Sequence, residues 1–404
     1  MSRASEETEI DARIAALIDL DQIVEDTCDL IAGMGENPGG TEGETVRRLL
    51  AICERIGADT ELQEIAPGRP NLLAGLGPKD GPAILFLGHS DVVPAGEGWH
   101  ADPFAPRVLD GEIIGRGSTD MKGGLAAVLA AMAAVHELSP ELRLELLCTV
   151  DEEDRALGVQ AWLADHPPRE YLACVVAEPT DLEIVVGCRG AANLNLEVFG
   201  GSAHAGRPED GASSIYGASR IVELVRGFHA EARAGERDAL LGTATWNVGT
   251  LVGGTGTSMV PRLTELTIDR RTMPGEDAWE ILDHLLIAAR ADIAGSGIPN
   301  AERIEVRGTV DMVMPGFRTD EDAPIVRIAA RSLTEQQGMP AKITGWTAAC
   351  EGGFIARHNG TPTIILGPGD INTQAHQPDE RVSIEHIGIA ARAYASIALG
   401  IAQR

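Results

Sequence analysis

The sequence predicts an α/β fold with a mostly parallel central sheet, interrupted by a smaller inserted α+β domain of ferredoxin-like order. Three observations indicate this. Short apolar runs, Ala83 to Leu87, Arg143 to Val150 and Tyr171 to Ala177, each end close to a histidine or carboxylate, as buried parallel strands with chemistry at one sheet edge do. After Gly187 the pattern changes to alternating, half-buried strands. A chain of 404 residues also exceeds what one core comfortably supports.

The first domain is predicted to comprise residues 1–187 and 314–404. Its first part has helical spacing over residues 10–34, a Gly/Pro-rich loop over residues 33–43, and further elements in alternation. These are a helix at Thr45 to Ile56, a strand at Asn71 to Gly75, a loop at Trp99 to Gly117 and an Ala-rich helix at Leu125 to Leu138. The chain returns to this domain with a helix at Ala323 to Leu333, a strand at Thr361 to Leu366 and a final helix from Ile384.

The inserted domain is predicted to span residues 188–313. Strands are expected at Ala191 to Phe199, Thr243 to Leu251, Leu263 to Ile268 and Ile304 to Val313, with helices at Ile215 to Phe228 and Trp279 to Ile293. Four strands with only two helices favour a small α+β layer.

Composition limits the partners and the compartment. The net charge of −28 argues against nucleic acid or an anionic membrane as partner, because both require a basic face. The six cysteines are scattered without a C-x-x-C pair, which is typical of a reducing compartment. The first ten residues are polar and acidic, and no apolar run approaches transmembrane length. A cytoplasmic location is therefore expected.

The segment from Ala83 to Pro94 carries the first candidate site residues. His89 and Asp91 follow the strand two positions apart, so they share one face of an extended chain. This pair suggests a metal ligand with a carboxylate that orients it. Taken alone, a histidine after a strand is more often a hydrogen-bonded loop residue.

Five potential ligands, His89, Asp120, Glu153, Glu178 and His376, lie at or near predicted strand ends. Two imidazoles and three carboxylates suit Zn²⁺, Co²⁺ or Mn²⁺. Five are too many for one tetrahedral zinc with an open position, but they suit two metals when one carboxylate bridges.

Glu152, beside Glu153, offers a carboxylate that need not bind metal, as a general base requires. The run Asp151 to Asp154 considered alone is more often a solvated acidic turn. Consecutive residues of a strand point to opposite faces, so Glu152 and Glu153 can serve one site only where the strand ends and the backbone turns.

The chain resembles the M20 metallopeptidase family, especially its deacetylase, desuccinylase and carboxypeptidase members, over essentially its whole length. The matching segments are Gly88 to Pro94, Trp99 to Pro103 with Gly115 to Gly124, Thr149 to Glu153, Ala177 to Thr180 and Ile365 to Glu380. The resemblance implies a zinc-peptidase-like catalytic domain with two divalent metal ions, zinc first, with cobalt or manganese as alternatives.

The resemblance also implies a role for each candidate. His89, Asp120 and Glu178 would hold one metal, and Asp120 (as a bridge), Glu153 and His376 the other. Glu152 would take a proton from the bridging water and pass it to the leaving amine.

Other features of the catalytic domain follow from the same resemblance. Asp91 would steer His89 and fix its tautomer, and the peptide after Asp120 would be cis. A glutamate at position 178 is similar to the deacylase and carboxypeptidase branch of the family.

The inserted domain would be a lid that also makes a homodimer. The segment Gly201 to Pro208 resembles the family's lid motif, whose histidine, here His204, reaches the neighbouring subunit's site and stabilises the oxyanion. Arg189 and Arg271 match arginines that bind a substrate carboxylate; an ion pair within the lid is the alternative for each. Glu351 stands where relatives often have aspartate, which leaves the substrate open.

The predicted function is hydrolysis of the amide bond of an N-acyl amino acid. A carboxypeptidase or dipeptidase acting on short peptides with the same site is the second hypothesis. A non-catalytic binding protein on this fold is the third, and the intact ligand set and Glu152 speak against it.

Overall fold

The computed structural model of the protein describes residues 3–403. Side chains are described from Glu9 onward. The chain divides into two compact units. Unit 1 comprises Met1–Gly187, Arg318–Gly345 and Glu351–Arg404, and unit 2 comprises Cys188–Phe317 and Trp346–Cys350.

Unit 1 is built around a nine-stranded sheet of order β1-β2-β6-β3-β7-β15-β8-β13, with β14 paired to β8. The sheet is mixed. The central strands β6, β3, β7 and β15 run parallel, β2 pairs antiparallel with β6 and β8 with β15, and β1 pairs antiparallel with β2. The strands are β1 (Asp59–Ala66), β2 (Arg69–Leu76), β3 (Ala83–His89), β6 (Arg143–Thr149), β7 (Tyr171–Val176), β8 (Ile184–Cys188), β13 (Phe317–Arg318), β14 (Ile343–Trp346) and β15 (Thr363–Ile365).

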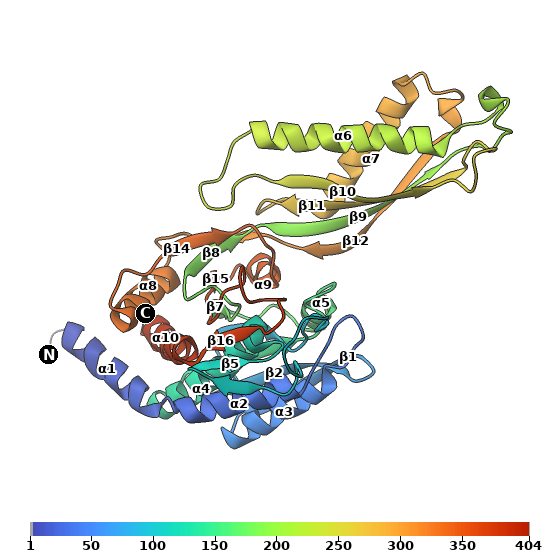
Figure 1. The fold of residues 1–404 in the computed structure, drawn as a ribbon. Coiled ribbons are helices and arrows are strands. Elements are labelled where there is room, and N and C mark those ends of the chain that lie inside the picture. The colour runs from blue at the N-terminus through green and yellow to red at the C-terminus, as the bar shows by residue number, and fades with distance from the viewer. Residues whose placement is uncertain (1–2, 404) are drawn as a thin grey trace. The chain divides into compact units, whose positions relative to one another are not determined.

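Helices cover both faces of this sheet. Figure 1 shows α2, α3 and α4 on one face and α5 and α9 on the other. The helices of unit 1 are α1 (Arg3–Leu17), α2 (Leu20–Ala32), α3 (Gly43–Arg55), α4 (Gly123–Leu138), α5 (Leu157–Asp165), α8 (Pro324–Gln337), α9 (Gly352–Asn359) and α10 (Ile384–Ala402). Alternate side chains of β3 therefore meet different helices: the Phe86 ring lies 5.7 Å from that of Tyr394 on α10, whereas Leu85 faces the side of α5 and α9.

The apolar runs found in the sequence form the core of unit 1. Every residue of β3 and β6 is buried, as expected for strands covered on both faces. The segment Ser118–Leu138 is long and apolar enough to cross a membrane, which corrects the expectation that no run approaches that length. However, 72% of its apolar window is buried inside the protein, so its small side chains serve the packing of α4 in unit 1.

Several elements were not expected from the sequence. Strand β1 is largely exposed, and a separate three-stranded sheet joins β4 (Arg107–Leu109), β5 (Glu112–Ile114) and β16 (Arg381–Ser383).

The Asp120–Met121 peptide bond is cis, which confirms the expectation of a cis peptide after Asp120.

Unit 2 has a four-stranded antiparallel sheet of order β10-β11-β9-β12. The elements follow one another as β9 (Gly190–Phe199), α6 (Ser214–Ala234), β10 (Thr245–Gly253), β11 (Leu263–Thr272), α7 (Ala278–Gly295) and β12 (Glu305–Met314). Figure 1 shows α6 above β10 and β11. Both helices contribute to one core with the sheet, as Ile221, Leu285 and Leu194 illustrate.

Candidate metal centre

The ends of three parallel strands bring the predicted site residues together. His89 is the last residue of β3, and Glu178 lies two positions beyond the end of β7. Glu152 and Glu153 occupy the turn that follows β6. Because β6, β3 and β7 are parallel neighbours, their carboxyl ends meet at one sheet edge, where α/β proteins place their ligands.

Asp120 lies between two imidazoles. Its Oδ1 is 3.2 Å from Nε2 of His89, and its Oδ2 is 3.4 Å from Nε2 of His376. One carboxylate thus faces a different histidine with each oxygen, which is the arrangement that a bridging ligand requires.

Each histidine also meets a second carboxylate. Nε2 of His89 lies 3.4 Å from Oε1 of Glu178, and Nε2 of His376 lies 3.3 Å from Oε2 of Glu153. Two groups of three side chains therefore share Asp120. His89 is buried, whereas the His376 side chain is 48% exposed and opens the second group to water.

Glu152 belongs to the same cluster. One ligand atom each of His89, Glu152 and Glu178 lie within 4.8 Å of one another, as do those of His89, Asp120 and Glu153. The structure thus brings together the five predicted ligands and the predicted base.

Burial and like charge change the proton affinities of the cluster. Burial, reinforced by Asp120, raises the pKa of Glu178 to about 7, and burial also raises the pKa of Glu152 and Glu153. Hydrogen bonds to Asp120 and Glu153 raise the pKa of His376 to about 10. Burial would raise the pKa of Asp120, but its hydrogen bonds with His376 and His89 outweigh burial and lower it. Crowded carboxylates in a low-dielectric site favour any cation that can neutralise them.

The donor set fits divalent metal ions. Oε1 of Glu153 is buried and has no hydrogen-bond partner among the described residues, so one oxygen of this carboxylate is free to act as a ligand. Imidazole and carboxylate donors suit zinc, cobalt or manganese.

Asp91 lies where the sequence predicted, but it contacts His89 differently. Nδ1 of His89 is 2.9 Å from the main-chain carbonyl oxygen of Asp91 and 3.5 Å from its carboxylate oxygen Oδ1. The carbonyl is therefore the nearer acceptor and orients the ring, while the carboxylate accepts hydrogen bonds from Glu152 N–H (3.2 Å) and Glu153 N–H (3.1 Å).

Two buried carboxylates near the cluster, Glu380 and Glu351, make contacts that the sequence did not predict. Glu380 accepts the N–H groups of Thr119 (2.9 Å) and Asp120 (3.0 Å) and pairs with Arg116 at 2.5 Å. Glu351 is buried and accepts a 2.5 Å hydrogen bond from Thr149, and burial raises its pKa to about 8. Their partners lie about 200 residues or more away in the chain, so no local pattern indicates these contacts.

The remaining predicted site residues belong to unit 2. His204 is exposed, and its Nδ1 accepts a hydrogen bond from Gly206 N–H at 3.0 Å. Arg271 forms the ion pair within its own unit that was the alternative interpretation, with Asp269 at 3.2 Å. Arg189 donates to the main-chain carbonyls of Thr243 (2.7 Å) and Thr347 (3.1 Å).

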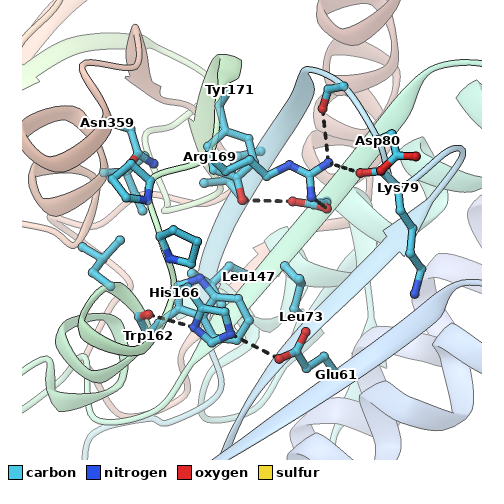
Figure 2. Close-up of a pocket in the computed structure, with 17 residues that line it drawn as sticks. Glu61, Leu73, Lys79, Asp80, Leu147, Trp162, His166, Arg169, Tyr171 and Asn359 are labelled. Carbon is cyan, nitrogen blue, oxygen red and sulfur yellow. Dashed lines mark hydrogen bonds and ion pairs between the residues drawn. The ribbon is translucent and has the colours of Figure 1, made fainter.

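A separate cavity of about 430 Å³ lies in unit 1 and is lined by residues of β2, β6, α5 and α9. Figure 2 shows His166 stacked on Trp162, with ring centroids 3.6 Å apart, and bonded to Glu61. Arg169 and Tyr171 both bond to Glu145 in the same cavity. None of the predicted site residues lines this cavity.

The fold and the cluster define a class: an α/β protein with histidines and carboxylates gathered at the carboxyl ends of its parallel strands, as in metal-dependent hydrolases. The family description "Peptidase family M20/M25/M40" matches residues 85–400. An acetylornithine deacetylase of Aliivibrio fischeri (strain ATCC 700601 / ES114) is 30% identical over 353 residues, covering 85% of this chain and 88% of the relative.

Two further similarities agree with this match. A succinyl-diaminopimelate desuccinylase of Sulfurovum sp. (strain NBC37-1) is 31% identical over 320 residues, covering 76% of this chain and 81% of the relative. The crystal structure of an M20 family metallo-carboxypeptidase from Sulfolobus solfataricus has the same fold, with a TM-score of 0.77 at 18% identity, covering 95% of this chain and all of the other (100%).

The chain belongs to peptidase family M20. It is a metal-dependent amidohydrolase.

Proposed function

We propose that the protein removes the acyl group from an N-acyl amino acid, with Glu152 as general base at a two-metal site. The observation that carries the proposal is the shared carboxylate of Asp120, which faces His89 with one oxygen and His376 with the other. Relatives named deacetylase and desuccinylase support the class of substrate.

Two groups of residues would hold the metals. His89, Asp120 and Glu178 would bind one, and Asp120, Glu153 and His376 the other; we propose zinc, with cobalt or manganese as alternatives. Bound divalent ions supply a Lewis acid for the amide carbonyl and lower the pKa of a water molecule.

Glu152 would perform the proton transfers. Its partly buried carboxylate would accept a proton from the attacking water as the C–O bond forms. It then donates that proton to the amide nitrogen as the C–N bond breaks, so the products are a carboxylic acid and a free amine. Burial raises the pKa of Glu152, which strengthens it as a base.

The test of this role is Glu152→Ala. We expect kcat to fall by at least about 10²–10⁴-fold, with the metal content measured by elemental analysis unchanged. Asp154→Asn, which alters an exposed carboxylate in the same turn, is the control and should retain full activity. Loss of metal together with activity in Glu152→Ala would assign Glu152 to the ligands instead.

The substrate class is tested by measuring the hydrolysis of a panel of compounds after chelation and re-addition of Zn²⁺, Co²⁺ or Mn²⁺. The panel contains N-acetylornithine, N-succinyl-diaminopimelate, other N-acyl amino acids and dipeptides. Activity on the acyl amino acids supports the proposal. Activity on peptides alone would support the second candidate, a carboxypeptidase or dipeptidase, which the fold of the metallo-carboxypeptidase favours.

We further propose that unit 2 is a ferredoxin-like lid and the dimerisation domain of a cytoplasmic homodimer. His204 would stabilise the oxyanion in the partner's site, and Arg189 and Arg271 would bind the substrate carboxylate. The exposure of His204 supports a role outside its own unit. The scattered cysteines, which include no C-x-x-C pair, support a reducing compartment.

Mixing two inactive variants tests whether His204 acts on the partner. In a Glu152→Ala/His204→Ala heterodimer, one site would combine an intact Glu152 with an intact His204 from the other subunit. Statistical mixing should then restore about a quarter of the wild-type rate. If His204 serves its own subunit's site, or if the enzyme is a monomer, the mixture stays inactive.

A further inference from the structure

We propose that Asn37 and Arg69 are positioning residues for the Glu152–Glu153 turn. They would act through the carboxylates of Asp91 and Asp151. The inference rests on the proposed function, because it takes this turn to carry the base and one metal ligand.

Asp91 fixes the backbone of the turn directly. One of its oxygens accepts Glu152 N–H at 3.2 Å, and the other accepts Glu153 N–H at 3.1 Å. Two consecutive N–H groups bound to one buried carboxylate determine where both glutamate side chains start. The position of Asp91 therefore controls the base and the ligand together.

Asn37 holds that carboxylate in place. Its amide nitrogen donates to Oδ2 of Asp91 at 2.9 Å and to Oδ1 of Asp151 at 3.2 Å. All three residues are at most 2% exposed. The two hydrogens of the amide thus bridge two buried carboxylates that would otherwise repel each other.

Arg69 completes the support from the other side. Its Nη2 lies 2.9 Å from Oδ1 of Asp151, the same oxygen that Asn37 contacts. Its Nε donates to both oxygens of Glu42 at 3.0 and 2.9 Å, and Glu42 is fully buried. The planar guanidinium can serve both carboxylates at once, which a lysine ammonium cannot reproduce.

The contacts form one connected path from Glu42 through Arg69, Asp151, Asn37 and Asp91 to the backbone of the turn. Every link is a hydrogen bond between side chains until the last, which reaches the main chain. Asp151 itself begins the turn with a φ of 69°, so the path holds the turn at its first residue and at the two that follow.

The proposal makes a specific prediction for Asn37→Asp. This change keeps the shape but replaces a double donor by a third carboxylate, so the turn should shift. We expect the affinity for Co²⁺ to fall about 10–100-fold. It is measured by adding Co²⁺ to the protein after a chelator has removed its metal and following the visible absorption. We expect kcat to fall by a similar factor with little change in KM, because Glu152 would be misplaced.

Arg69→Met should lower the Co²⁺ affinity and kcat in the same way as Asn37→Asp. Arg69→Lys should retain only part of the wild-type Co²⁺ affinity and kcat. Arg143→Met is the matched control. Arg143 is a buried arginine at the first position of β6, whereas the Glu152–Glu153 turn follows the last position of that strand. Arg143 pairs with Asp59 at 2.7 Å and with Glu145 at 3.0 Å. Its loss should lower thermal stability but leave the Co²⁺ affinity and spectrum of the folded protein unchanged.

The outcomes separate this inference from the proposed function. If Asn37→Asp and Arg69→Met lose only thermal stability, as Arg143→Met does, and bind Co²⁺ like the wild type, the positioning role is wrong. If the wild-type protein binds no Co²⁺, or if Glu152→Ala remains fully active, the proposed function itself fails. Weaker Co²⁺ binding confined to the Asn37 and Arg69 variants supports the inference.

Discussion

Asp120 is the residue on which both halves of the proposed metal centre depend. Each of its oxygens faces a different imidazole, and the residue is only 6% exposed. Removing its charge therefore affects both groups of ligands at once, whereas loss of Glu153 or Glu178 affects one.

Asp120→Asn should reduce the metal content from two ions per chain to less than one. An amide cannot bridge two cations as a carboxylate does, so we expect kcat/KM to fall by about 10³-fold or more. Elemental analysis and steady-state kinetics measure both effects. Asp110→Asn alters an exposed carboxylate and serves as control. Two tightly bound metals in Asp120→Asn would contradict the bridging role.

Glu380 accepts a hydrogen bond from the backbone N–H of Asp120. Glu380→Gln leaves the buried Arg116 charge without its partner and should cost about 3–5 kcal/mol of unfolding free energy. Urea denaturation of the metal-free protein measures this cost. The double variant Arg116→Met/Glu380→Gln should cost less than the sum of the two single changes, because they share one interaction. Additive effects would show that the pair is energetically independent.

At the scale of elements, helix α4 packs directly against the end of β7, where Glu178 follows. A Cβ added at Gly124 would lie 2.3 Å from the carbonyl oxygen of Ala177, so only glycine allows this approach. The packing of a helix thus determines where a proposed ligand is placed.

Gly124→Ala should therefore destabilise the protein by about 1–3 kcal/mol through overpacking and weaken metal binding. The control is Gly227→Ala within α6, where an added Cβ meets nothing within 4 Å. That change should instead stabilise the protein by about 0.5–1 kcal/mol through helix propensity. Chemical denaturation measures both. Equal effects of the two substitutions would contradict the close packing of α4 on β7.

The elements that carry the proposed site were the most predictable from the sequence. Strands β3 and β7 are mostly apolar, β6 is apolar apart from Arg143, Glu145 and Thr149, and the ends of the three strands are followed or marked by His89, Glu152 and Glu178. Strand β1 and helix α9 lack such signals: β1 is largely exposed, and α9 has only eight residues.

The supporting residues could not be predicted in the same way. Asn37 was part of a loop defined only by its glycines and proline, and it contacts Asp151 across 114 positions. The metal-binding roles of the individual residues stay predictions, which the metal analyses of their variants test.

At the scale of the whole molecule, metal binding should stabilise unit 1 and leave unit 2 unaffected. All proposed ligands lie in unit 1, and unit 2 has a hydrophobic core of its own. Each site filled at 100 times its Kd adds about 2.7 kcal/mol. Because a protein of two units need not unfold in one step, the effect must be measured separately for each unit.

Hydrogen exchange with and without a chelator makes that distinction. Removing the metals should speed exchange of the amides of Glu152, Glu153 and Asp120, whose acceptors are the buried carboxylates of Asp91 and Glu380. Amides in β9 and β11, paired from Leu263↔Phe199 to Thr272↔Gly190, should exchange at unchanged rates. Glu152→Ala should respond to chelation like the wild type, because it keeps every proposed ligand. Faster exchange in unit 2, or no change near Glu152, would show that metal does not act through this cluster.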